Sequence, residues 1–211
     1  MKPGDVVQVR IERLLAGGDA IARQESSGGK GMVVFVPFAA PGDVARVQVT
    51  ERKKGYVKAT LVELIERSPS RREPRCEHFG TCGGCTWQHV EYGEQLRWKQ
   101  EIVRESLRRI GGIEWVREIP IESASEWGYR ARAQWKVAAK KGSRWPSVGY
   151  HARGSHEVVD VRACPILAPE LERALAHERE RLHDAPVLPE EIEASISSGC
   201  LLYTSPSPRD S

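Results

Sequence analysis

The spacing of the cysteines constrains this chain more than any other feature of its sequence. Three of the five cysteines stand close together, as Cys76-x5-Cys82-x2-Cys85, and Cys164 follows 79 residues after the third. The C-x2-C pair places two thiols on one tight turn, and the two glycines between them let the backbone bend around a bulky centre. Four thiolates suit a zinc ion or a [4Fe–4S] cluster. The spacing therefore predicts one inorganic centre and leaves zinc and iron open.

Other uses of these cysteines agree less well with the sequence. A redox-active pair at Cys82 and Cys85 would need a strand–helix context, which the flanking residues do not provide. Structural disulfides are disfavoured in a reducing compartment. Three unrelated buried thiols would not be expected within ten residues of one another. Cys200 is left over, and we assign it no role.

The composition is that of a cytoplasmic protein without a membrane segment. Hydrophobic residues make up 40% and charged residues 29% of the 211 residues. No apolar run approaches the roughly 20 residues that a membrane-spanning helix needs, and the N-terminus lacks the apolar core of a signal peptide. The length allows one ordinary domain or two small ones. The net charge of +3 says little about partners.

The first third of the chain has the pattern of a small β-barrel. Apolar and polar residues alternate with the period of a half-buried strand, and glycine-rich turns separate the apolar stretches. Five short strands with such turns suggest a closed, OB-like barrel. The expected strands cover residues 5–12, 20–23, 32–36, 44–50 and 56–65.

The rest of the chain predicts an α+β domain after a polar linker at 66–75. The fold class is therefore mainly β with α. Apolar residues of 91–110 fall on one helical face, and two glycines stop the helix. The remaining expected elements are strands at 129–138, 147–150, 157–161 and 191–196 and a charged helix at 171–183. Residues 200–211 lack periodicity, and we expect a non-native or disordered tail there.

Basic residues are in excess between Arg52 and Arg75, where the sequence has eight lysines and arginines but only three acidic residues. Such an excess can attract a polyanion, and an OB-like barrel offers cations for phosphates and aromatic rings for bases. The alternative is that these charges are simply solvated. We expect Phe35, Trp87 and Trp135 in the core. The candidate RNA contacts are Lys53, Lys54, Tyr56 and Lys58 around one turn, and Arg130 and Arg132 on a later strand.

Several segments resemble the bacterial 23S rRNA (uracil-5-)-methyltransferases. They are CEHFGTCGGCTWQH from Cys76, GYRARA from Gly128, and VGYHARGSHEVVDVRACPI from Val148, which carries Cys164 and Pro165. The first 65 residues resemble the TRAM domain, a small RNA-binding barrel that opens these enzymes. The resemblance covers about residues 3–199, and its motifs are specific in combination.

The resemblance implies that Cys76, Cys82, Cys85 and Cys164 hold a [4Fe–4S] cluster, which favours iron over zinc. It also implies two domains, a TRAM barrel at 1–66 and an iron–sulfur segment with part of a central domain at 67–199. The implied partner is RNA, and 23S rRNA in particular. We expect the protein to be a monomer. Because methylation of uracil transfers no net electron, we expect the cluster to act as a structural brace.

The family's chemistry depends on a Rossmann-like domain that binds S-adenosylmethionine and carries a catalytic cysteine and a carboxylate base. No segment here matches those motifs, so we carry over no catalytic residue and no methyl-donor site. We expect an N-terminal fragment of such an enzyme, inactive alone.

Two other functions stay open on the sequence. One is a stand-alone RNA-binding iron–sulfur or zinc module without catalysis. The other is a radical enzyme, since TRAM barrels also accompany methylthiolating enzymes. Those enzymes use C-x3-C-x2-C, whereas the first gap here is five residues and a fourth cysteine is present.

Overall fold

The computed structural model describes residues 1–23, 31–197 and 200–204. The chain divides into two compact units. The barrel unit comprises residues 1–74 and 86–123, and the cysteine unit comprises residues 75–85 and those from 124 onward. This division differs from the predicted domain boundary at 66–67, because Val90, Trp87 and Trp98 pack into the barrel's core.

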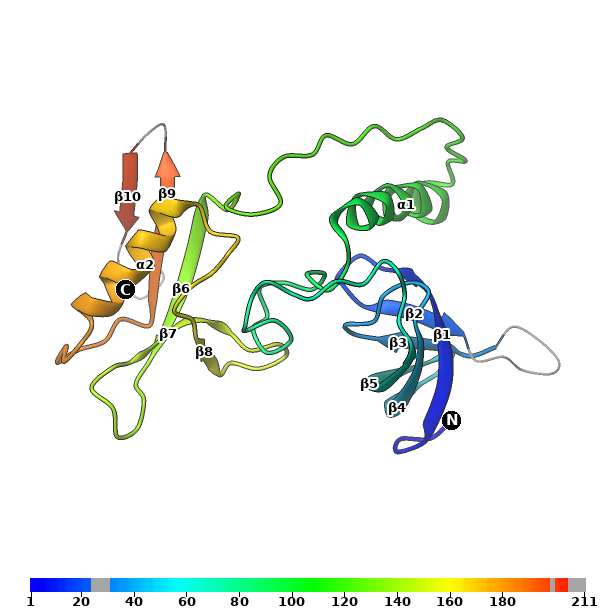
Figure 1. The fold of residues 1–211 in the computed structure, drawn as a ribbon, viewed down its shortest axis with the longest axis horizontal. Helices are drawn as coiled ribbons and strands as arrows, with labels where there is room; N and C mark the ends of the chain where they lie inside the picture. The colour runs from blue at the N-terminus through cyan, green and yellow to red at the C-terminus, as the bar shows by residue number, and fades with distance from the viewer. Residues whose placement is uncertain (24–30, 198–199, 205–211) are drawn as a thin grey trace. The chain divides into compact units, whose positions relative to one another are not determined.

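The barrel unit is built on a closed five-stranded barrel, as the alternating pattern predicted (Figure 1). Neighbouring strands follow the order β1-β2-β3-β5-β4, with β3 and β5 parallel and the other pairs antiparallel. Register shifts along β4 and β5 mark bulges, which bend a sheet enough to close it. The strands are β1 (Val6–Leu14), β2 (Ala20–Arg23), β3 (Val33–Val36), β4 (Val44–Lys53) and β5 (Tyr56–Glu66).

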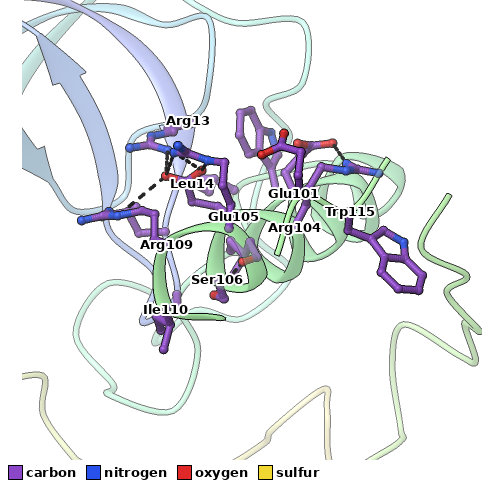
Figure 2. Close-up of a pocket in the computed structure, with 15 residues that line it drawn as sticks. Arg13, Leu14, Glu101, Arg104, Glu105, Ser106, Arg109, Ile110 and Trp115 are labelled. Carbon is purple, nitrogen blue, oxygen red and sulfur yellow. Dashed lines mark hydrogen bonds and ion pairs between the residues drawn. The ribbon is translucent and has the colours of Figure 1, made fainter. Parts of the chain in front are cut away.

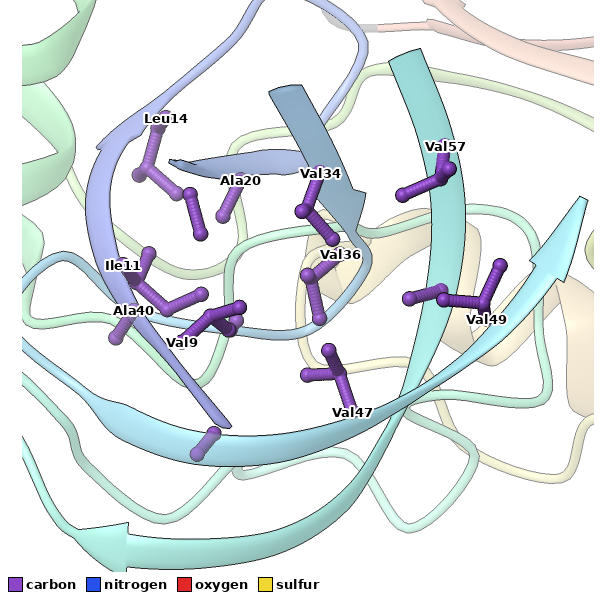
Figure 3. Close-up of a cluster of buried hydrophobic side chains, with 14 of the residues drawn as sticks. Val9, Ile11, Leu14, Ala20, Val34, Val36, Ala40, Val47, Val49 and Val57 are labelled. Carbon is purple, nitrogen blue, oxygen red and sulfur yellow. The ribbon is translucent and has the colours of Figure 1, made fainter. Parts of the chain in front are cut away.

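Small branched side chains fill the interior of the barrel (Figure 3). Alternate residues of each strand point inward, because side chains alternate along an extended strand. Ten of the inward residues are Val9, Ile11, Leu14, Ala20, Val34, Val36, Ala40, Val47, Val49 and Val57, all 3% exposed or less. Phe35, which we predicted in the core, is only half-buried and lies on the outer face between two inward valines. That prediction was wrong.

The polar stretch at 66–75 is fastened to the barrel rather than free. Asp43 is fully buried, and its carboxylate accepts hydrogen bonds from Arg71 Nε at 2.9 Å and from the backbone N–H of Ser68 at 3.0 Å. The Arg71 side chain is only 9% exposed and also donates to the Phe38 carbonyl at 2.8 Å. Paired and hydrogen-bonded charges can be buried where single charges cannot. The stretch is therefore anchored to the barrel at Ser68 and Arg71, while charges such as Arg67 and Glu73 remain exposed to solvent.

Helix α1 (Tyr92–Gly111) matches the predicted helix closely. Gly112 ends it in the left-handed conformation, with φ of 65°, which glycine adopts without steric cost. Glu105 of α1 pairs with Arg13 at the end of β1, at 3.6 Å. The helix thus belongs to the barrel unit, although the sequence placed it in the second domain.

A buried histidine makes the stability of the barrel unit depend on pH. His89 is 2% exposed, and burial, with Arg71 nearby, lowers its pKa from 6.5 to about 4. The fold therefore favours the neutral ring, so its contribution is complete above pH 6.5 and is lost as the pH falls towards 4.

We expect the barrel unit to lose about 3 kcal/mol between pH 7 and pH 4 through this one group. Urea unfolding at both pH values measures the loss, and His89→Gln should flatten the pH dependence by that amount while lowering stability at pH 7. An unchanged pH dependence in His89→Gln would contradict the assignment.

The cysteine unit contains a five-stranded antiparallel sheet in the order β10-β9-β6-β7-β8. Helix α2 (Pro169–Arg181) lies beside the sheet (Figure 1) and buries Leu171, Ala174 and Leu175 against it. Trp135 is fully buried, as predicted. The strands are β6 (Arg132–Ala138), β7 (Ser147–His151), β8 (Val158–Asp160), β9 (Glu191–Ser197) and β10 (Cys200–Thr204).

Strand β10 was not predicted. The expected tail at 200–211 begins instead with five residues that pair with β9, from Cys200 opposite Ser197 to Thr204 opposite Glu193. The sequence CLLYT is apolar and aromatic, which suits a strand. Residues 205–211 lie outside the described part of the chain. Among the described residues, no helix is long and apolar enough to span a bilayer.

Candidate metal centre and nucleic-acid interface

The segment at 76–85 is held by backbone pairing to the turn that follows β7. Cys82 forms a β-bridge with Ala152, and the Gly83 N–H donates to the His151 carbonyl at 2.9 Å. A Cβ atom on Gly83 would lie 2.9 Å from that carbonyl oxygen. The sequence predicted a glycine that lets the chain bend, whereas this glycine is required because two backbones approach closely.

The four predicted ligands all lie in the cysteine unit and share one electrostatic environment. Cys164 enters from the loop between β8 and α2 and is 8% exposed. Burial raises the pKa of its thiol to about 11, and Cys85 and Cys76 add to the rise. Burial also raises the pKa of the Cys76 and Cys82 thiols, and Cys85 acts on both.

Backbone N–H groups point at three of the four sulfurs. Gly84 donates to Cys82 Sγ at 3.4 Å. The His78 N–H donates to the sulfur of Cys76, and the Ile166 N–H donates to the sulfur of Cys164. Each of these bonds opposes the rise in the pKa of its thiol. Such bonds favour the thiolate and are a usual means of tuning a thiolate-bound cluster. The donor chemistry therefore fits a four-thiolate centre.

The described side chains do not converge on a single ion. Among all the residues that the structure describes, no group of three or more histidine, cysteine, aspartate or glutamate side chains is arranged to hold a metal ion. A tetrahedral zinc ion with Zn–S bonds of about 2.3 Å would draw four sulfurs tightly together. A [4Fe–4S] cluster binds each cysteine through a different iron and needs a wider ring of sulfurs.

Arg130 and Arg132, predicted as one RNA-binding pair, have different surroundings. The Arg130 side chain hydrogen-bonds Tyr150 and acts electrostatically on Cys82. Arg132 is exposed and donates from Nε to Glu193 of β9 at 2.6 Å. Arg130 thus lies beside the cysteines, and RNA contact by either arginine stays a prediction.

The four candidate residues on the barrel lie around the β4–β5 turn. Lys53 and Lys58 both pair with Glu51, at 2.5 and 2.9 Å, and these bonds hold the pKa of Glu51 at about 2. Tyr56 contacts Phe35 edge to face, with ring centroids 5.1 Å apart. Lys54 lines a hollow over this aromatic pair. Their binding of RNA stays a prediction as well.

Two hollows in the barrel unit meet at one cluster of charges. The helix hollow lies between α1, the end of β1 and Trp115, and has a volume of about 700 Å³ (Figure 2). The aromatic hollow lies over Phe35 and Tyr56, with a volume of about 710 Å³. Both are lined by the arginine cluster, which we define as Arg13, Arg108 and Arg109 with Glu105.

Only a weak signal for this cluster is present in the sequence. Arg108 and Arg109 stand in the last turn of the helix, where basic residues often complement the helix dipole without any further role. Only the folded barrel unit brings Arg13 of β1 to the same carboxylate. The sequence also does not indicate that Phe35 points outward, because MVVFV is apolar throughout and shows no alternation.

Comparisons with known proteins agree with the barrel and extend beyond it. The TRAM domain family matches residues 1–62. The 23S rRNA (uracil(1939)-C(5))-methyltransferase RlmD of Photorhabdus laumondii is 37% identical over 170 residues, which are 81% of this chain and 37% of that protein. The enzyme of the same name from Methylococcus capsulatus is 36% identical over 199 residues, covering 92% of this chain and 43% of its own length.

A solved structure supports the fold. The crystal structure of Pyrococcus abyssi tRNA (uracil-54, C5)-methyltransferase in complex with S-adenosyl-L-homocysteine matches with a TM-score of 0.60 and 23% identity, over 92% of this chain and 44% of that one. The chain spans about two fifths of the length of the curated relatives that it matches. The chain is therefore similar to the 23S rRNA (uracil-C5)-methyltransferases over most of its own length, and its first 62 residues match the TRAM domain family.

Proposed function

We propose that this chain is the RNA-binding and cluster-binding part of an S-adenosylmethionine-dependent RNA methyltransferase that forms 5-methyluridine in 23S rRNA. The observation that carries the proposal is the combination of a TRAM barrel with four cysteines that share one environment, in a chain 36–37% identical to two such enzymes. Such an enzyme works in the cytoplasm, and we propose a monomer.

The cysteines Cys76, Cys82, Cys85 and Cys164 would hold a [4Fe–4S] cluster. The backbone N–H groups aimed at three of their sulfurs support this assignment. When bound, the cluster would supply a rigid crosslink between the 76–85 segment and the loop before α2. Methyl transfer to uracil C5 needs no electron from it.

The barrel's own residues would grip the RNA. Lysines and arginines neutralise phosphates, and Tyr56 and Phe35 offer ring surface to an unstacked base. The target base of such an enzyme must leave its stack to be modified, so a grip on neighbouring single-stranded nucleotides helps to hold the RNA in that state. S-adenosylmethionine would bind in a different domain, and we assign no residue of this chain to it.

We expect the purified 211-residue chain to bind a 23S rRNA fragment more tightly than a tRNA of equal length, with affinity that falls as salt rises. Filter binding over a salt series measures both properties. With S-adenosylmethionine added, we expect no 5-methyluridine in nuclease digests of the RNA. Equal or tighter binding of tRNA would contradict the rRNA assignment, and 5-methyluridine formed by the chain alone would contradict its inactivity.

The alternative is a stand-alone RNA-binding module that holds a cluster or zinc. The discriminating observation is the reading frame downstream of codon 199 in the source genome. A frame that continues into a methyl-donor-binding domain supports the methyltransferase, whereas a stop after Ser211 supports the module.

A further inference from the structure

The arginine cluster carries more positive charge than its own carboxylate can balance. Glu105 lies 2.8 Å from Arg108, 3.6 Å from Arg13 and 3.9 Å from Arg109, so one carboxylate of the cluster faces three guanidinium groups. Glu114, which lines the helix hollow, also acts electrostatically on Arg108, which leaves three positive charges against two negative ones. Arg108 and Arg109 remain 54% and 65% exposed. The hydrogen bonds that Arg108 donates hold the pKa of Glu105 low. An anion approaching from solvent therefore meets a net positive site.

Aromatic side chains flank this positive site on both sides. In the helix hollow, Trp115 is 41% exposed and lies at the end away from Arg13 and Arg109 (Figure 2). In the aromatic hollow, Tyr56 and Phe35 are half-buried on the outer face of the barrel, with Lys54 at the rim. The four residues of the arginine cluster line both hollows, so the hollows adjoin.

This order of groups matches the order of groups along a nucleic-acid strand. Bases alternate with phosphates, and a base can lie against an aromatic ring only when it is unpaired and unstacked. The excess of cations disfavours a basic peptide in the same place, and the exposed aromatic rings beside it suit unpaired bases, which an acidic peptide lacks. The outer face of strands β2 and β3 and the β4–β5 turn are also where OB-like barrels bind oligonucleotides.

We infer that single-stranded RNA crosses the barrel unit over the arginine cluster, with its phosphates at Arg108 and Arg109 and bases in the two hollows, at Trp115 and at Tyr56. This inference rests on the proposed RNA-binding role and gives that role a site. Helix α1 thereby becomes half of the RNA-binding surface, with the TRAM barrel as the other half.

The test measures the affinity of the full chain for a fluorescein-labelled, single-stranded RNA of about ten nucleotides, within the range of site sizes for such barrels. The double variant Arg108→Gln/Arg109→Gln should bind about tenfold more weakly at moderate salt. Its plot of log affinity against log salt should flatten by about 1.4, at about 0.7 for each single-strand phosphate contact. The control is Lys140→Gln/Lys141→Gln, which removes the same charge from an exposed turn of the cysteine unit.

Two further variants test the bases. Tyr56→Leu and Trp115→Leu should each weaken binding about tenfold, as expected for the loss of one stacked base, whereas Tyr56→Phe should retain it. Duplex RNA of the same length should compete poorly. Circular dichroism of each variant checks that the fold is intact.

The results separate this inference from the proposed function. If the wild-type chain binds RNA but the arginine and aromatic variants bind as well as the control, the RNA runs elsewhere and the hollows serve another partner, such as a protein segment. If the control loses as much affinity as Arg108→Gln/Arg109→Gln, only net charge matters and the inference fails. If the wild-type chain binds no RNA, the proposed function fails too.

Discussion

Replacing Asp43 with alanine is expected to lower the free energy of unfolding of the barrel unit by about 3–5 kcal/mol, the usual cost of breaking a buried ion pair from one side. Asp43 is fully buried, and the Arg71 side chain that it binds is only 9% exposed. The variant leaves that guanidinium and the Ser68 N–H without the carboxylate that now accepts their hydrogen bonds. Urea unfolding followed by tryptophan fluorescence measures the loss.

The exposed pair of Arg46 and Glu63 provides the matched control. These side chains lie on neighbouring barrel strands at 2.9 Å but are 57% and 54% exposed. Glu63→Ala should therefore change stability by less than about 1 kcal/mol, because solvent already screens the pair. The double variant Asp43→Asn/Arg71→Leu should recover part of the loss by removing the unpaired charge. A loss of under about 1 kcal/mol in Asp43→Ala would show that the pair does not hold the 66–75 stretch on the barrel.

The second large effect is expected at Cys82. In anaerobically reconstituted protein, Cys82→Ser should remove the cluster. The free energy of unfolding of the cysteine unit should then fall by about 4 kcal/mol, which is the stabilisation expected from a ligand present at a thousand times its dissociation constant. The loss should stay in that unit, because all four cysteines belong to it. Hydrogen exchange of backbone amides measures it separately on β7 and on β4.

Strand β4 of the barrel unit serves as the internal control. Its amides should exchange equally slowly in the wild-type protein and in Cys82→Ser, while those of β7 exchange faster in the variant. Equal protection of β7 in both proteins would show that the cysteine unit is stable without a bound centre. Faster exchange of both strands would show that the two units unfold together.

Local patterns were enough to predict most of the elements. Strands β1 and β4 have the period of two that one buried face imposes, and α1 has an apolar face and a glycine stop. The four cysteines could be singled out because thiols rarely cluster without a purpose. In each case the information lies within a short stretch of sequence or in one rare residue type.

Longer-range features could not be predicted in the same way. The pairing of Asp43 with Arg71 joins residues 28 apart in the sequence, and neither shows that it is buried. The packing of Trp98 into the barrel assigns α1 to the first unit, although the helix follows the cysteine segment. Strand β10 was overlooked because the polar residues after Thr204 suggested a tail. These features depend on which surfaces meet, and a single sequence does not encode that in any periodic pattern.

The most direct test of the account is the iron content of the reconstituted chain and of its five single cysteine-to-serine variants. The protein is loaded anaerobically with iron and sulfide, and iron, sulfide, zinc and the visible absorption are measured per chain. We predict about four irons per wild-type chain, as a [4Fe–4S] cluster requires. Loss of the cluster is expected in the serine variants of Cys76, Cys82, Cys85 and Cys164, with full retention in Cys200→Ser. One zinc per chain without iron after anaerobic preparation, or equal loss in Cys200→Ser, would contradict the assignment.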